Sequence, residues 1–423
     1  MSNIISISIN NFRSYKNNTE FSFEAIDSDL RKGNYHDVQL ANGNVVRLLN
    51  SAVIYGANAA GKSNVVIALL AISSFIRTSK RYDPEDKIKY EPYLFSPEKR
   101  NAPIEMSVRF IADKKVYDYC IKYTHKAFIY EQLRMADSEE MVFERGEDGV
   151  THFNQEFLPG FAAENYLVNH LAMSELSLKA HPLLQAIYKE LASIKAVPLT
   201  DEYRMGDSSK ETAKLLHDEP DGSFTTMIKE LITSADTGII DVKIEEVDEK
   251  KFTFLDSFPD LKSRIISENK YEINMVHPSE DGCLVDLPLR VESAGTKTLF
   301  TAGTRVLKAL QEGSFLAYDE MNIALHPMLF RRLVELFNNE VTNPNSAQLL
   351  VTTHDATLME DNLLRADQVW FVEKKNGVTE LFSAIEFKGV SIDQPFEHWY
   401  RSGRLGGQPR FSPLSLDVKQ IEN

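Results

Sequence analysis

The stretch Gly56-Ala57-Asn58-Ala59-Ala60-Gly61-Lys62-Ser63 decides how the rest of this sequence is interpreted. It fits the pattern G-x-x-x-x-G-K-[ST] at every fixed position. An apolar run over residues 52–55 precedes it, and apolar residues recur with helical spacing from residue 62 to about residue 77. The sequence therefore predicts a buried strand, a loop bracketed by two glycines and a helix, which is the context that this pattern requires.

Such a loop binds phosphate. The glycines let the backbone turn tightly, so that its N–H groups converge on phosphate oxygens, and the following helix adds its N-terminal dipole. Lys62 is expected to contact the β- and γ-phosphates of ATP, and Ser63 to hold Mg²⁺. An ordinary glycine-containing turn is the alternative, which the flanking strand and helix disfavour. The residues expected at the nucleotide are Gly56, Asn58, Ala59, Ala60, Gly61, Lys62, Ser63 and Asn64.

Two later strands end in polar residues that suit nucleotide hydrolysis. The apolar run over 315–318 ends in Asp319 and Glu320. Asp319 is expected to join Ser63 at Mg²⁺, and Glu320 to polarise the attacking water as a general base. The run over 348–353 ends in His354, which can hydrogen-bond the γ-phosphate and sense its loss. Each strand end alone would equally suit a solvated turn or an ordinary histidine, and the phosphate loop favours the catalytic interpretation.

A second anion-binding helix start lies between these motifs. Ser293-Ala294-Gly295 opens a predicted helix that continues over 299–310. Because one phosphate loop already serves the bound nucleotide, Ser293 and Gly295 are expected to contact the γ-phosphate of a nucleotide held by another subunit. A simple helix cap is the alternative. The order of the motifs favours the binding role.

Composition limits the class of protein. The chain has 423 residues, a net charge of −15 and 43% hydrophobic residues, so it can bury a substantial core. No apolar run reaches the roughly 18 residues of a membrane span, and the start of the chain has no signal-peptide pattern. Two distant cysteines, Cys120 and Cys283, suit a reducing cytoplasm. The acidic balance argues against a large non-specific nucleic-acid surface, although it allows a local basic groove.

The pattern along the chain predicts an α/β fold with a mixed sheet. Residues 4–9 alternate as a strand, residues 11–14 form a turn, and residues 104–134 form an antiparallel meander. Helical spacing over 176–195 and 224–234 surrounds a polar connector over 199–222. We therefore divide the chain into 1–160, the first half of an ATPase head with an antiparallel β subdomain; 161–270, an inserted helical lobe; 271–400, the second half of the head; and 401–423, a tail.

The order of these motifs resembles the ABC-type P-loop ATPases. It is most similar to the branch that contains the structural-maintenance-of-chromosomes (SMC) and RecF-like proteins and the overcoming-lysogenization-defect (OLD) nucleases. In that branch the turn that resembles Asn11-Phe12-Arg13-Ser14 brings an arginine toward the nucleotide, which implies a binding role for Arg13. Residues 293–295 resemble the signature motif, Asp319 and Glu320 the Walker B pair, His354 the switch histidine, and residues 322–327 the Leu-His-Pro segment at the dimer-facing loop.

Shorter segments, 292–296 and 400–409, look like the small prokaryotic AAA ATPases of phage-defence and abortive-infection loci, such as RloA and the AbiL ATPase. Four features depart from the ABC and OLD patterns. No Q-loop glutamine is identifiable, although residues 90–95 occupy a suitable place. The signature lacks its Leu-Ser-Gly-Gly form, only short helices are expected over 160–270 in place of a coiled coil, and the 23 residues after Tyr400 leave no room for an OLD-type nuclease domain.

The resemblance implies a cytoplasmic ATPase that forms a homodimer, or a higher homo-oligomer, around ATP and Mg²⁺ and controls a separately encoded effector, a nuclease or toxin, without a membrane. A RecF-like or SMC-like DNA clamp is the alternative, for which Arg401, Arg404 and Arg410 form a small basic cluster. A solvated C-terminal segment or a subunit contact is the alternative explanation of these arginines, and the composition favours it. A third reading is an assembly protein that binds ATP and scarcely hydrolyses it.

Overall fold

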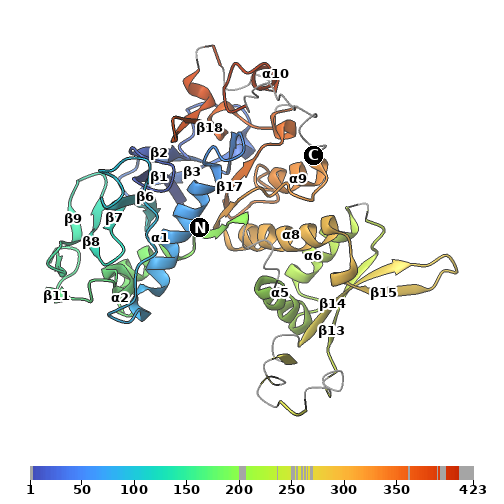
Figure 1. Cartoon of the computed structure of the whole chain (residues 1–423). Coiled ribbons are helices and arrows are strands. Elements are labelled where there is room, and N and C mark those ends of the chain that lie inside the picture. Colours follow the sequence, from blue (N-terminus) through green and yellow to red (C-terminus); the bar gives the residue numbers. More distant parts are fainter. Residues whose placement is uncertain are drawn as a thin grey trace, which may run out of the picture.

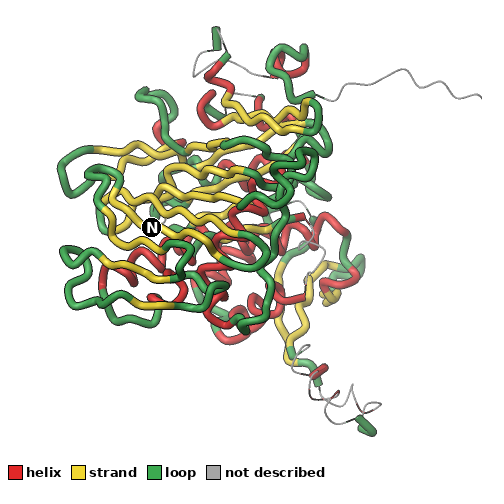
Figure 2. Tube along the Cα trace, turned by 60° about the vertical axis from the view of Figure 1, so that its left-hand side comes forward, coloured by secondary structure: helices red, strands yellow, loops and turns green. Residues whose placement is uncertain are grey.

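The computed structural model describes residues 3–199, 206–235, 237–248, 253, 256–258, 261, 263, 265–266, 270–360, 363–387, 389–390 and 397–408. Two large sheets, their helices and a smaller projecting arm make up these residues (Figure 1). Figure 2 shows most of the strands gathered in one body, with the helices beside them. Short 3₁₀ helices include η1 (Lys32–Asn34), η2 (Ser79–Arg81), η4 (Leu289–Val291), η5 (Ala356–Met359), η6 (Ala366–Gln368) and η7 (Ala384–Glu386).

A six-stranded sheet carries the predicted motifs. Its order is β12-β16-β17-β5-β18-β19, and every neighbouring pair is parallel except β18 with β19. The strands are β5 (Ser51–Gly56), β12 (Lys195–Val197), β16 (Phe315–Tyr318), β17 (Gln348–Thr353), β18 (Val369–Lys375) and β19 (Val378–Ser383). Every residue of the central strands β5, β16 and β17 is buried, and most of them are apolar, because both faces of the sheet are covered.

Alternate residues of β5 enter two different cores. Ile54 belongs to the core that contains helix α1 (Lys62–Thr78), whereas Val53 and Tyr55 belong to the core with helices α8 (Ala294–Glu312) and α9 (Pro327–Glu335). This alternation is the period of two along an extended strand. The sheet is therefore a central layer with helices on both sides.

An eight-stranded antiparallel sheet shares the α1 core. Its order is β11-β10-β9-β8-β7-β6-β1-β2, so the predicted first strand and the meander over 104–134 are confirmed and lie in one sheet. The strands are β1 (Asn3–Asn10), β2 (Thr19–Ser22), β6 (Ile104–Ala112), β7 (Lys115–Tyr123), β8 (Phe128–Met135), β9 (Met141–Arg145), β10 (Val150–Phe153) and β11 (Glu164–Asn165); a separate hairpin joins β3 (Tyr35–Gln39) and β4 (Val45–Leu49).

The region between the two halves differs from the expectation in three places. The helix expected over 176–195 is instead α2 (Ala172–Leu176) and α3 (Pro182–Ala192), because Pro182 suits only the first turn of a helix. Residues 195–197 form β12, so this region is not only helical and supplies the edge strand of the six-stranded sheet. The predicted polar connector contains helix α5 (Gly206–Asp218), which buries Ala213 and Leu216 three residues apart.

A projecting arm follows. Helix α6 (Ser223–Thr233) packs on α8 in the second core, and strands β13 (Asp241–Glu246), β14 (Tyr271–Pro278) and β15 (Leu284–Pro288) form a three-stranded sheet that extends from the body (Figure 1). The chain ends its described part with helix α10 (Glu397–Arg401) and residues up to 408. In the described residues, no helix combines the length and apolar character needed to cross a membrane. The α/β class with a mixed sheet and an antiparallel N-terminal sheet is confirmed.

Candidate nucleotide-binding site

The topology brings three predicted motifs to one sheet edge. Strands β5, β17 and β16 are parallel neighbours, so their carboxyl ends lie together. The loop over residues 56–63 follows β5, His354 follows β17, and Asp319 and Glu320 follow β16. Ligands of open parallel sheets bind at this edge.

Both motif glycines occupy places that admit no side chain. A Cβ atom at Gly56 would lie 2.4 Å from a methyl carbon of Val372. Gly61 has a φ of +114°, and a Cβ there would lie 2.6 Å from the Thr379 hydroxyl oxygen. The loop is therefore shaped by close approach of its backbone to strands β18 and β19, while Asn58 and Ala59 remain exposed.

Lys62 and Glu320 form the electrostatic centre of the site. The Lys62 Nζ donates to the Gly56 carbonyl at 3.0 Å and lies 3.1 Å from Glu320 Oε1. The two side chains are only 5% and 10% exposed, so this ion pair is largely removed from water. His354 Nδ1 lies 3.0 Å from Glu320 Oε2, although the angles do not make a hydrogen bond and this buried oxygen has no hydrogen-bond donor within the described chain.

Thr352 holds the two acidic residues in place. Its hydroxyl donates to Asp319 Oδ1 at 2.5 Å and accepts from the Glu320 backbone N–H at 3.0 Å. The Leu199 N–H, just after β12, also approaches Asp319 Oδ2 at 3.4 Å. Glu320 has a left-handed φ of +51°, a strained conformation for a non-glycine residue that is typical of functional sites.

Arg13 lies beside the start of α1 and is held by an acidic partner. Its guanidinium bonds both carboxylate oxygens of Glu91 at 2.9–3.1 Å and donates to the Asn64 side chain at 3.3 Å. Asn64 in turn donates to the Ser14 hydroxyl at 2.7 Å. Glu91 lies within the segment 90–95 where no Q-loop glutamine was identifiable, so this segment does reach the nucleotide region through a carboxylate.

The predicted signature segment, residues 293–295 at the start of α8, differs in structure from the phosphate loop. Ser293 caps α8 by accepting from the Thr296 N–H, and it remains exposed. A Cβ at Gly295 would lie 3.0 Å from the Ala324 carbonyl, so the tip packs on the loop that follows Glu320. No described hydrogen bond or ion pair joins Ser293 to the phosphate loop of the same chain.

A family model described as "AAA domain, putative AbiEii toxin, Type IV TA system" matches residues 51–360. The match runs from the strand before the phosphate loop to beyond His354 and covers well over half of the chain. The chain belongs to this AAA family. It is therefore an ATPase of the P-loop class, and the predicted ATP-binding P-loop ATPase is confirmed at that level.

Three solved structures are also similar to this AAA protein. The Smc head bound to the C-winged helix domain of ScpA shares 15% identity, covers 92% of this chain and 98% of its own, and has a TM-score of 0.47. The SMC head domain from Thermotoga maritima shares 15% identity, covers 90% of this chain and 98% of its own, and has a TM-score of 0.42. The Pyrococcus furiosus Smc head domain with an extended coiled coil, bound to the C-terminal domain of ScpA, shares 13% identity, covers 95% of this chain and 100% of its own, and has a TM-score of 0.46. No functional inference rests on these likenesses, and a search of curated proteins found no match.

The site of this AAA protein has the groups that Mg²⁺ and a triphosphate require. The Ser63 hydroxyl has no hydrogen-bond partner among the described residues, and Asp319 is a buried carboxylate held by Thr352. A cavity of about 440 Å³ runs along the loop, between residues 57–60 and the turn that joins β18 to β19. No group of three or more His, Cys, Asp or Glu side chains that could hold a metal ion occurs in the described residues.

Sequence reasoning missed several residues of the site. Thr352 was recognised only as part of a strand, and Glu91 only as part of a loop without glutamine. Thr379 was not noticed at all, yet its hydroxyl donates at 2.7 Å to the Ala60 carbonyl and lies 2.7 Å from the Ser14 hydroxyl. The two consecutive threonines before His354 were the one available signal, because hydroxyls at the end of a buried strand require polar partners.

Proposed function

We propose that two copies of this chain close around ATP and Mg²⁺, that Glu320 promotes hydrolysis, and that the nucleotide state controls a separately encoded nuclease or toxin in cytoplasmic antiphage defence. The observation that carries the proposal is the juxtaposition of Lys62, Glu320 and His354 at one sheet edge. A lysine that ends a glycine loop and a carboxylate with an unoccupied buried oxygen are the two groups that a nucleotide hydrolase needs.

In the structure, Lys62 is paired with Glu320. Binding of a triphosphate requires Lys62 to exchange this carboxylate for phosphate oxygens. Glu320 is thereby released, and its Oε2 can accept a proton from a water molecule. When bound, Mg²⁺ neutralises phosphate charge, and Ser63 and Asp319 would hold it. His354, at 55% exposure, can turn toward the nucleotide without breaking a hydrogen bond within the described chain.

The proposal of a shared site is supported by the surface around Ser293. This residue is exposed, and Val291, two positions before it in the chain, is an apolar side chain that is 58% exposed. An exposed helix start with an exposed apolar neighbour is available to a second subunit. ATP that bridges the phosphate loop of one subunit and the Ser293 segment of another would favour the dimer only as far as it binds the dimer more tightly than the separate subunits.

The proposal of a defence role is supported by the family description, which names a putative AbiEii toxin and a type IV toxin–antitoxin system. The DNA-clamp alternative has less support, because its basic tail residues are engaged. Arg401 bonds Glu397 and Arg404 lies 4.6 Å over the Trp399 ring, while Arg410 lies outside the described residues.

A mixing experiment tests the shared site. Lys62→Ala removes the loop function, and Ser293→Arg blocks the exposed tip. Each variant alone is expected to lose ATP turnover. An equimolar mixture should recover about a quarter of it, because about half of randomly formed C₂ dimers are mixed and each has one intact site. Ser138→Arg, a matched change at an exposed turn, should keep full turnover.

The absence of any recovery, together with an ATP-independent molecular mass, would overturn the shared site. ATP-dependent retention of duplex DNA, weakening steeply with added salt, would instead favour the clamp. Co-purification with a neighbouring gene product without DNA would support the effector role.

A further inference from the structure

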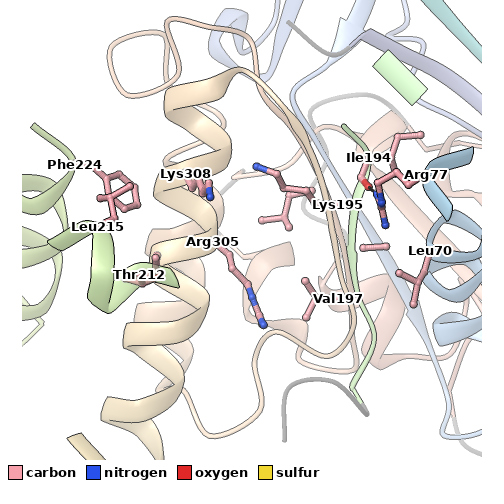
Figure 3. A pocket seen from close by; sticks show the side chains of 13 residues that line it. Leu70, Arg77, Ile194, Lys195, Val197, Thr212, Leu215, Phe224, Arg305 and Lys308 are labelled. Carbon is pink, nitrogen blue, oxygen red and sulfur yellow. Dashed lines mark hydrogen bonds between the residues drawn. The ribbon is translucent and has the colours of Figure 1, made fainter. Parts of the chain in front are cut away.

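A second cavity lies away from the phosphate loop. It has a volume of about 670 Å³ and lies between α1, β12, α5, α6 and α8 (Figure 3). This size falls within the range of about 300–1,000 Å³ that small-molecule sites occupy. None of the groups assigned to ATP, Mg²⁺ or the dimer lines it.

The lining of this cavity is strongly positive. Its cationic residues are Arg77 of α1, Lys195 of β12, and Arg305 and Lys308 of α8, and none of the thirteen lining residues that the structure describes is acidic. The chain as a whole has a net charge of −15, so four cations in the described lining stand out from its composition. A cavity lined by charges of one sign focuses the electrostatic field and attracts ligands of the opposite sign, here anions.

The cations are arranged around one volume. Arg305 and Lys308 are three residues apart and therefore share a face of α8. Figure 3 shows them opposite Arg77, with Lys195 between the two helices. Arg77 is fixed by donating to the Ala192 carbonyl at 3.1 Å, and Lys195 pairs with Glu312 outside the lining. Within the described chain, Lys308 has neither a hydrogen-bond nor an ion-pair partner, so its charge is available.

Apart from Thr212 and Thr304, the rest of the described lining is apolar. Leu70, Val197, Leu215, Phe224 and Leu316 contribute aliphatic and aromatic surface. Phe224 is only 6% exposed and Leu316 is fully buried, so this surface belongs to the folded core. A cavity with convergent positive groups and apolar walls suits a ligand that has an anionic group and a flat or apolar body.

We propose that this cavity binds a small phosphate-bearing ligand with a planar body, of the nucleoside monophosphate class, at a site separate from the ATP site. Helix α1 begins at Lys62 and helix α8 begins just after Ser293. A ligand that contacts Arg77 and Lys308 bridges the two helices that carry the two halves of the proposed ATP contact. Its binding free energy can therefore be coupled to ATP binding.

The test uses the full chain with Lys62→Ala, so that triphosphate binding at the loop does not contribute. The probes are AMP, inorganic pyrophosphate and adenosine, measured by isothermal titration calorimetry. AMP is expected to bind with a Kd of about 10 μM to 1 mM, and more tightly than either pyrophosphate or adenosine. Adding Lys308→Glu should weaken AMP at least about tenfold, as for the loss of one charge-assisted hydrogen bond.

The matched control is Lys126→Glu, the same charge change at an exposed hairpin turn, which should leave the affinity for AMP unchanged. Melting temperatures confirm that both variants fold. The proposal is overturned if AMP does not bind at millimolar concentration, or if Lys308→Glu binds it as well as the control. Binding of hexaglutamate in place of AMP would also overturn it and would indicate an acidic segment of a partner. Because these measurements do not depend on Lys62, their failure leaves the ATP proposal standing.

Discussion

The ion pair between Lys62 and Glu320 makes an unusual prediction for Glu320→Gln. This change should tighten ATP binding while it abolishes turnover. The lysine expected to contact phosphate pairs with a carboxylate oxygen 3.1 Å away. ATP must compete with that carboxylate. Glutamine keeps the shape of glutamate and an acceptor oxygen, but it removes the negative charge that holds Lys62.

The magnitude follows from burial. The two side chains are 5% and 10% exposed, so solvent screens their attraction only weakly. A hydrogen bond to a charged group contributes about 1.5–3 kcal/mol, against about 1 kcal/mol for a neutral acceptor. The difference, about 1 kcal/mol, corresponds to roughly fivefold tighter binding of ATP. Loss of the general base should lower turnover by about 10²- to 10⁴-fold.

The assay is calorimetric titration with Mg-ATP, paired with phosphate release under the same conditions. Glu156→Gln is the matched control, because Glu156 is exposed on a loop and should change neither quantity. Weaker or unchanged ATP binding by Glu320→Gln would refute the idea that Glu320 restrains Lys62. Turnover at the level of the unaltered protein would refute its role as the base.

Two further predictions concern stability. Thr352→Val should lower the free energy of unfolding by about 2–3 kcal/mol, because the Asp319 carboxylate and the Glu320 N–H both lose a buried hydrogen-bond partner. Urea unfolding measures this change, and an unchanged unfolding midpoint would contradict the prediction. Burial raises the pKa of Glu190 to about 7, so the folded state binds a proton that the unfolded state releases near its ordinary pKa of 4.5. The contribution of Glu190 to the free energy of unfolding should therefore be full below pH 4.5 and fall by up to ~3 kcal/mol as the pH rises through 7. Urea titrations at pH 5 and 8 measure this pH dependence, which Glu190→Gln should remove. An equal pH dependence in both proteins would count against the prediction.

Much of the candidate site could be predicted because its parts are local in sequence. The strand, loop and helix around Gly56 and Lys62 follow from apolar periodicity and from glycine chemistry, which act over a few residues. The acidic residues after β16 and His354 after β17 were recognised in the same way, from polar residues at the ends of apolar strands. The role of Ser293 toward a second subunit and the division of the chain into four segments remain predictions.

Other features could not be predicted because their cause is distant in sequence. β12 is too short to show a period, and it is a strand because it pairs with β16 about 120 residues later. Helix α5 has a charged, polar sequence and forms where it packs Ala213 and Leu216 into the second core. Glu91 becomes part of the site only because it meets Arg13 across 78 positions.

The sequence by itself determined the chemistry of this protein: a phosphate loop, a carboxylate pair and a histidine, each at the end of a strand. Tertiary structure decided which groups these residues meet. The order of the strands brought Glu320 next to Lys62 and Thr352 into hydrogen-bonding contact with Asp319 and Glu320. The packing of the helices brought four cationic side chains to one cavity. The physical reason is range, since backbone preferences and hydrophobic period act between near neighbours. A buried charge, by contrast, is stable only beside a partner, and that partner can come from any part of the chain that the fold brings close.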